Sequence, residues 1–115
     1  MATTQDVLDH HLKALMAGDV DEVLADYAES SVLATQDATV RGLSALREFF
    51  VGAVTELLPP GSRLELTAQV VDGDHAYIVW NGESEKYRLL FGTDTFVVRD
   101  GTIVFQSFAG QIEPK

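Results

Sequence analysis

Arg63-Leu-Glu-Leu-Thr-Ala-Gln-Val-Val-Asp-Gly-Asp74 is the stretch from which the fold class follows. From Arg63 to Val70, apolar residues alternate with charged or polar ones, which is the period-two pattern of a strand with one solvated face. Asp72, Gly73 and Asp74 then supply the residues of a tight turn. Strands joined by a tight turn pair antiparallel, so this stretch predicts the first hairpin of a sheet.

The rest of the chain extends this hairpin in both directions. Downstream, residues 75–82, 87–98 and 102–112 are expected strands, with a second tight turn at 100–101. Upstream, helical spacing predicts a helix over 4–17, a shorter one capped by Asp19 with an apolar stripe reaching Tyr27, and a third from about Gly42 to Pro59. A short strand or hairpin is expected between 31 and 40. This order predicts an α+β domain with its helices on one face of a bent sheet.

Composition narrows the classes of partner. The chain has 115 residues, no cysteine, and 8 basic against 18 acidic side chains, for a net charge of −10. We expect one domain over residues 1–115, without disulfides or thiolate metal sites. Phosphate backbones and anionic lipids would be repelled, so nucleic acids and membranes are not expected partners. No signal peptide or membrane span is recognisable in the sequence, so a cytoplasmic protein is expected. The three histidines make no convincing metal site, and no cofactor is expected.

Two polar residues interrupt apolar stripes and are candidates for a functional site. His11 lies in the apolar stripe of the first helix, where it is either a satisfied core residue or a pocket-lining donor or proton carrier. Asp94 shares a strand face with Phe96 and Val98. If that face points inward, burial raises the pKa of Asp94 and can leave it protonated as a donor. Alternatively, Asp94 belongs to a local polar kink after Gly92.

Gln106 and the aromatic residues give weaker signals. Gln106 stands between Val104 and Phe108 on one face of the last strand, where an amide could line a pocket, sit at the sheet edge or contact a second copy. Tyr77 and Trp80 are most simply interpreted as core or interface residues. Together with Phe108, they would also suit a flat apolar ligand.

Four segments occur in an order and spacing that resemble one superfamily. They are Met-Ala-Gly-Asp at 16–19, Asp-Tyr-Ala-Glu at 26–29, Arg-Gly-Leu-Ser-Ala-Leu-Arg-Glu-Phe-Phe at 41–50, and Thr-Asp-Thr-Phe-Val-Val-Arg-Asp-Gly-Thr-Ile-Val at 93–104. Over nearly its whole length the chain resembles the nuclear transport factor 2-like superfamily, in its SnoaL-like and ketosteroid isomerase-like branch. The resemblance implies a cone in which a curved mixed sheet wraps round three N-terminal helices. It also implies an apolar pocket and, commonly, a homodimer.

The resemblance further implies roles for individual residues. The isomerase's oxyanion-binding tyrosine falls on His11, and its protonated oxyanion-binding aspartic acid falls on Asp94. The general base falls close to Thr35, which cannot accept a proton as a carboxylate does, so Asp37 is the alternative base. The expected ligand-binding residues are Thr35, Tyr77, Trp80, Gln106 and Phe108.

Two functions from different classes follow from these observations. One is an enzyme that transfers a proton on a small apolar carbonyl or cyclic compound, with His11 as base or donor and Asp94 as a neutral acid stabilising an oxyanion. The other is a non-catalytic module that uses the same cone to bind a ligand, or the outer sheet face to dimerise. A homodimer is expected in both cases, because helices on one face leave the other face of the sheet uncovered.

Overall fold

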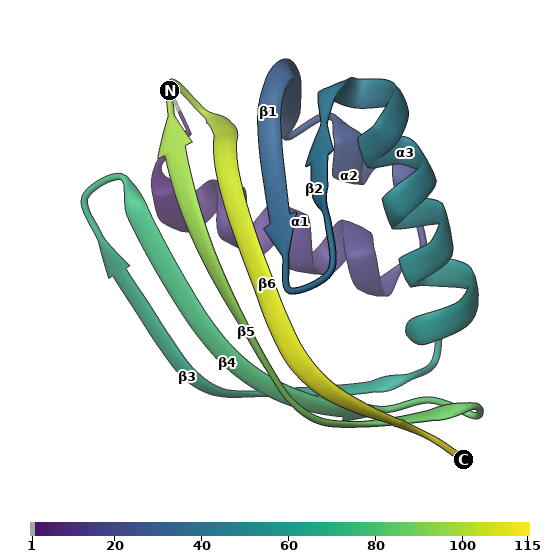
Figure 1. Cartoon of the computed structure of the whole chain (residues 1–115). Coiled ribbons are helices and arrows are strands. Elements are labelled where there is room, and N and C mark those ends of the chain that lie inside the picture. Colours follow the sequence, from purple (N-terminus) through teal and green to yellow (C-terminus); the bar gives the residue numbers. More distant parts are fainter. Residues whose placement is uncertain (1) are drawn as a thin grey trace.

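The computed structural model describes residues 2–115 and shows a curved sheet wrapped round helices (Figure 1). The elements are α1 (Thr4–Met16), α2 (Val20–Leu24), β1 (Tyr27–Thr35), β2 (Thr39–Arg41), α3 (Gly42–Gly52), the π-helical turn η1 (Ala53–Leu57), β3 (Arg63–Asp72), β4 (His75–Glu83), β5 (Tyr87–Arg99) and β6 (Thr102–Pro114). The sheet order is β2-β1-β6-β5-β4-β3, and only the β1–β6 pair is parallel among the described strands. The expected α+β cone is confirmed.

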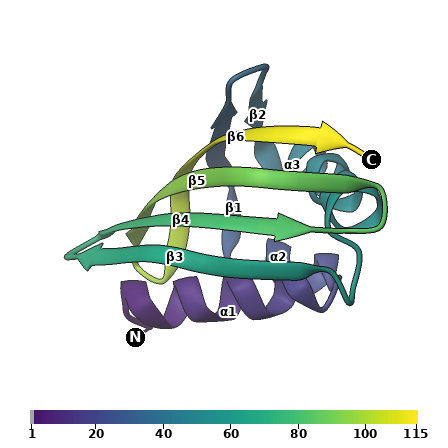
Figure 2. The same cartoon turned by 90° about the horizontal axis from the view of Figure 1, so that it is seen from below.

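The helices begin and end close to the positions that the sequence predicts. A capping box joins Thr3 and Asp6 at the start of α1, which satisfies backbone amides of its first turn. The third helix continues from α3 into η1, and Pro59 follows shortly after it. Seen at right angles to Figure 1, α1 runs below the long strands (Figure 2). None of the described helices is long and apolar enough to cross a membrane.

The boundary between α2 and β1 differs from the prediction. The helical stripe that reaches Tyr27 in sequence ends at Leu24 in the structure, and Tyr27 is the first residue of β1. The carbonyl of Asp26 accepts a hydrogen bond from the Ile103 amide at 2.7 Å, which draws the chain onto β6. Pairing with a strand far along the sequence therefore overrides the local helical pattern. The expected hairpin at 31–40 is present, but it begins earlier.

The bend of the sheet coincides with irregular strand pairing. Register shifts occur between Leu66 and Ala68, between Trp80 and Gly82, and between Leu89 and Phe91, all in neighbouring strands. Bulges and glycines are the features that let a sheet curve strongly. The curvature gives the sheet a concave face, which the helices cover, and a convex face.

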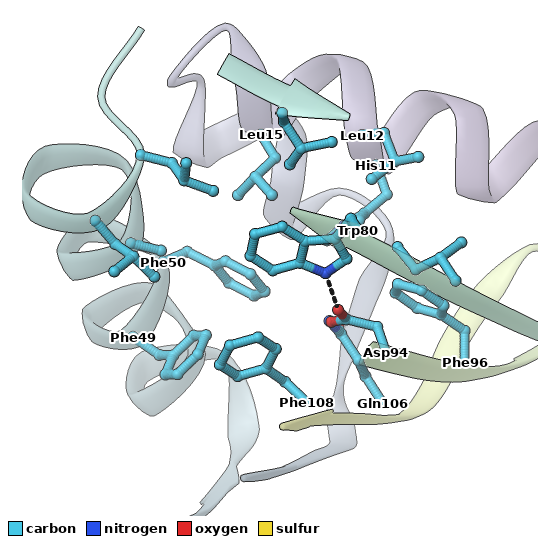
Figure 3. Close-up of a pocket in the computed structure, with 15 residues that line it drawn as sticks. His11, Leu12, Leu15, Phe49, Phe50, Trp80, Asp94, Phe96, Gln106 and Phe108 are labelled. Carbon is cyan, nitrogen blue, oxygen red and sulfur yellow. Dashed lines mark hydrogen bonds between the residues drawn. The ribbon is translucent and has the colours of Figure 1, made fainter. Parts of the chain in front are cut away.

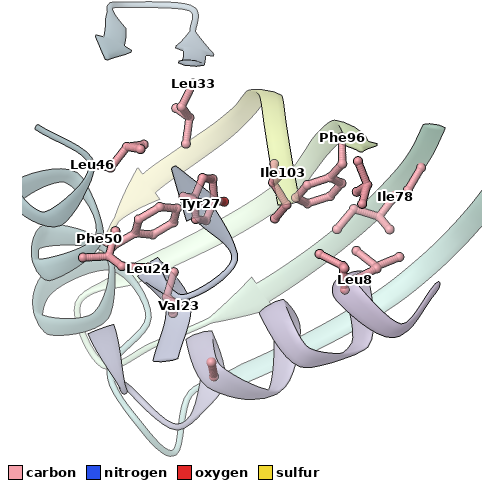
Figure 4. Close-up of a cluster of buried hydrophobic side chains, with 14 of the residues drawn as sticks. Leu8, Val23, Leu24, Tyr27, Leu33, Leu46, Phe50, Ile78, Phe96 and Ile103 are labelled. Carbon is pink, nitrogen blue, oxygen red and sulfur yellow. The ribbon is translucent and has the colours of Figure 1, made fainter. Parts of the chain in front are cut away.

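The concave face carries the hydrophobic core. Side chains from α1, α2, α3 and the sheet meet there in one buried cluster, which includes Leu8, Val23, Leu46, Phe50, Ile78, Phe96 and Ile103 (Figure 4). Strand alternation sorts the two faces: Ala76, Ile78 and Trp80 are buried, whereas Tyr77 between them is 40% exposed. The polar residues that share the concave face with this cluster are the ones that need an explanation.

Candidate functional site

A partly open cavity lies between the helices and the concave face of the sheet. Its volume is about 60 Å³, and most of its wall is aliphatic or aromatic. The polar side chains of His11, Asp94 and Gln106 interrupt this wall, and so does the indole N–H of Trp80 (Figure 3). Small-molecule sites typically combine an apolar wall with a few polar groups in this way.

Asp94 is held at the wall by two hydrogen bonds, one to each carboxylate oxygen. The Trp80 indole donates to Oδ1 at 2.8 Å, and the Gln106 amide Nε2 donates to Oδ2 at 2.8 Å. Both donors are neutral, and Asp94 is only 7% exposed. A carboxylate has about four lone-pair positions, so two accept no hydrogen bond from the described residues.

The position of the indole depends on a glycine. Gly92 is the β5 partner of Trp80, and a Cβ at that position would lie 2.5 Å from the indole ring. Only glycine leaves room for the ring to lie across β5 and reach Asp94. Alternation along β5 then turns Gly92, Asp94 and Phe96 to the same concave face. This inward placement of Asp94 agrees with the pocket interpretation and excludes the local polar kink.

Gln106 is itself held by Tyr27. The Tyr27 hydroxyl donates a hydrogen bond to Gln106 Oε1, while the other end of the same amide donates to Asp94. Gln106 is 3% exposed, and Tyr27 is also buried. The four side chains therefore form one connected network that runs from β1 through β6 and β5 to β4.

The pKa of Asp94 bears on the neutral acid that the isomerase resemblance implies. Burial raises the pKa of Asp94 to about 6, and the hydrogen bonds from Trp80 and Gln106 limit this rise. A group with that pKa is roughly nine-tenths ionised at pH 7. A pKa of about 6 favours an acceptor and base at neutral pH over the donor role that the resemblance implies.

His11 is a neutral imidazole in an aromatic environment. Its ring makes edge contacts with Tyr27, Phe50 and Phe96, at centroid distances of 5.4 to 6.0 Å. Desolvation lowers the pKa of His11 to about 4. Its Nδ1 is buried and has no hydrogen-bond partner among the described residues, which favours the pocket-lining interpretation over a satisfied core histidine.

The structure does not bring the expected base into the cavity. Thr35 ends β1, and its hydroxyl bonds within the hairpin, accepting from the amides of Asp37 and Ala38. Asp37 is exposed at the tip of the same hairpin. Both line a separate surface depression, which shares only Phe49 and Phe108 with the cavity.

The other predicted ligand-binding residues divide between the two sheet faces. Trp80, Gln106 and Phe108 line the cavity, and the rings of Trp80 and Phe108 stack with centroids 6.0 Å apart. Tyr77 points to the convex face instead, because it alternates with the buried Ile78. Tyr27 was missed as a member of the site. The available signal was the inward amide of Gln106, which needs a partner once it is buried.

Chemically, the site can accept a proton and bind an uncharged ligand. Among the described residues, its wall offers one carboxylate, one imidazole and no cationic side chain. Within residues 2–115, no cluster of three or more histidine, aspartate or glutamate side chains is arranged to hold a metal ion.

Comparisons with known proteins place the chain in a family. A family model described as a SnoaL-like domain matches residues 8–106. The chain is similar in structure to the epoxide hydrolase/cyclase-like enzyme SalBIII of pyran ring formation in the polyether salinomycin, at 16% identity and a TM-score of 0.81, covering 97% of this chain and 95% of that one. No curated protein matches the chain.

Two further solved structures have the same architecture. A candidate polyketide cyclase from Sinorhizobium meliloti is 22% identical with a TM-score of 0.74, covering 90% of this chain and 93% of the other. A candidate ketosteroid isomerase from Kribbella flavida is 19% identical with a TM-score of 0.76, covering 94% and 77%. At these identities the structures show the shared fold, whereas the family match spans most of the sequence. The chain belongs to the SnoaL-like family.

Proposed function

We propose that this domain binds a small, mostly apolar carbonyl or cyclic compound in the cavity and that Asp94 accepts a proton from it. The observation that carries the proposal is a buried carboxylate with free lone pairs at the wall of an apolar cavity. A pKa of about 6 suits a general base, because the group is ionised at neutral pH yet more basic than an exposed carboxyl. Solved structures that share this fold include a candidate ketosteroid isomerase, a candidate polyketide cyclase and an epoxide hydrolase/cyclase-like enzyme, and this likeness supports proton-transfer chemistry.

His11 supplies the second polar contact in this proposal. With a pKa of about 4, the ring is neutral at pH 7 and offers one donor and one acceptor nitrogen. It can therefore orient a ligand by a hydrogen bond without supplying charge. Proton abstraction belongs to Asp94, because His11 is the weaker base of the two.

The test uses two classes of probe, each of which loses a proton to a base. Enolisable cyclic ketones would be followed by deuterium uptake from D₂O, and hydroxy-epoxides by ring closure, both with NMR detection. We expect Asp94→Asn to lower the rate on an accepted probe at least tenfold, because an amide cannot accept the proton. Asp72→Asn makes the same chemical change at the exposed end of β3 and should leave the rate unchanged. Equal rates in wild type and Asp94→Asn would remove this role.

A second candidate is a binding module without catalysis. It is favoured by the small cavity volume of about 60 Å³ and by the absence of a second carboxylate from the residues that line it. The two functions are separated by recovery of the ligand. A compound that stabilises the fold and is recovered unchanged after prolonged incubation supports binding alone, whereas conversion that Asp94→Asn abolishes contradicts it.

We also propose that the convex face of the sheet pairs with a second copy. One row of this face consists of residues that are paired across neighbouring strands: Val70, Tyr77, Thr95 and Ser107. The neighbouring row of Ala68, Val79, Thr93 and Ala109 is likewise uncharged. A broad uncharged face on a chain with net charge −10 is where two copies can approach without repulsion.

A further inference from the structure

The orientation of one amide determines what Asp94 offers to a ligand. Gln106 donates through Nε2 to Asp94, and its Oε1 faces away to accept from the Tyr27 hydroxyl. If the amide turned over, its oxygen would face Oδ2 of Asp94. That arrangement is repulsive for an ionised carboxylate and favourable only if Asp94 carries a proton and donates it. The amide orientation and the protonation state of Asp94 are therefore coupled.

Tyr27 decides between these two arrangements. Its hydroxyl has a single proton, and the bond to Gln106 is the one hydrogen bond that this hydroxyl makes among the described residues. After an amide flip, Tyr27 would accept from Gln106 and its own buried proton would lose its acceptor. An unsatisfied buried donor is unfavourable, so Tyr27 keeps the oxygen of the amide on its own side.

The hydrogen bonds of the network run toward Asp94. Tyr27 donates to Gln106, Gln106 and Trp80 donate to Asp94, and no cationic side chain lines the cavity to bind an anion. Of the other titratable groups around Asp94, His11 on α1 is neutral and Tyr27 on β1 has its pKa raised well above the usual value by burial. What Asp94 leaves open toward the cavity is acceptor capacity alone.

We infer that Tyr27 is a positioning residue that fixes Asp94 as an acceptor, and that the ligand is an uncharged molecule with an O–H or N–H donor. This inference rests on the proposed function and narrows it: of the compounds allowed there, it selects those that lose a proton from a hydroxyl or an N–H, and it disfavours ketones that lose a C–H proton. A ketone offers Asp94 only an acceptor, and a carboxylate would add a second buried negative charge. Both are therefore poor ligands compared with an alcohol of the same shape.

Cyclohexanol and cyclohexanone are a matched pair of probes because they have the same ring and similar size. The alcohol has an O–H that can donate a hydrogen bond, whereas the ketone oxygen can only accept one. Dissociation constants at pH 7.5 would be measured by NMR on the full chain. We expect wild type to bind cyclohexanol at least tenfold more tightly than cyclohexanone, and Tyr27→Phe to reduce this ratio to threefold or less. In parallel, carboxyl ¹³C titration should show a higher pKa for Asp94 in Tyr27→Phe, because the freed amide can turn and accept from the protonated acid.

Tyr77→Phe is the matched control, because it removes the same hydroxyl from the convex face and should change neither quantity. The inference is overturned if wild type binds cyclohexanone as tightly as cyclohexanol, or if Tyr27→Phe leaves the Asp94 pKa and the ratio at the wild-type values. If Tyr27→Phe does not fold, Gln106→Met replaces it, and an unchanged Asp94 pKa in that variant is equally contradictory. Donor selectivity in wild type without turnover of any probe would contradict the proposed catalysis and leave this inference standing.

Discussion

Burial shifts the pKa values of Asp94 and His11 in opposite directions for one reason: the charged form of each is disfavoured away from water. Asp94 rises from 3.8 to about 6, so its contribution to stability is full below pH 3.8 and is lost as the pH rises to about 6. His11 falls from 6.5 to about 4, so its contribution is full above pH 6.5 and is lost as the pH falls to about 4. Shifts of this size correspond to about 3 kcal/mol each, with opposite slopes in the same window.

The difference in stability between each variant and wild type should report the pH dependence of the group removed. Relative to wild type, we expect Asp94→Asn to gain stability as the pH rises from 4 to 6, and His11→Phe to lose relative stability from pH 4 to 6.5. Urea denaturation of the three proteins across this range gives the difference profiles, in which all other titrating groups cancel. Two flat profiles would show that neither group is desolvated as the structure has it.

The sequence pattern predicted the position of Asp94 in the sheet but not its ionisation. Alternation along residues 87–98 was sufficient to put Asp94 on the face of Phe96 and Val98, and that prediction is confirmed. Its ionisation depends on Trp80, 14 residues away, and on Gln106, 12 residues away, and these donors become neighbours only when the strands pair. The role of Tyr27 depends on a contact across 79 residues, which no local pattern reports.

At the scale of elements, Gly92 in β5 allows the Trp80 ring to pack closely against the strand at the site. A Cβ at Gly92 would meet the Trp80 ring at 2.5 Å and its Nε1 at 2.9 Å, whereas a Cβ at Gly52 in α3 meets nothing within 4 Å. We expect Gly92→Ala to destabilise the fold by about 1–3 kcal/mol through overpacking, and to displace the indole from Asp94. Gly52→Ala, the same substitution, should stabilise by about 0.5–1 kcal/mol through helix propensity.

Chemical denaturation monitored by tryptophan fluorescence distinguishes these two results, since the chain has one tryptophan. A Gly92→Ala variant as stable as wild type, with an unchanged emission spectrum, would contradict the close packing of Trp80 on β5. The strands themselves were predicted well because their alternation is local. The end of α2 was not, because long-range pairing between β1 and β6 overrides the helical stripe.

At the scale of the whole molecule, the fold leaves its convex sheet face without a cover. Thr95 lies near the centre of that face, between Tyr77 on β4 and Ser107 on β6. We expect wild type to sediment as a dimer, at twice the chain mass of 12.5 kDa, and Thr95→Glu to sediment as a monomer. The introduced carboxylates would be buried without partners in the dimer, which is strongly unfavourable. A monomeric wild type at micromolar concentration would refute the proposed pairing.

The carboxyl ¹³C titration of wild type tests the central claim most directly, with Asp94→Asn identifying the resonance. An ionised, acceptor-only Asp94 in a desolvated cavity predicts a midpoint of about pH 6. A midpoint above pH 8 would make Asp94 a neutral donor at physiological pH, as in an oxyanion site, and would contradict the account. A midpoint near the ordinary value of 3.8 would contradict it as well, because the carboxyl would then be in contact with water and not enclosed beneath the helices.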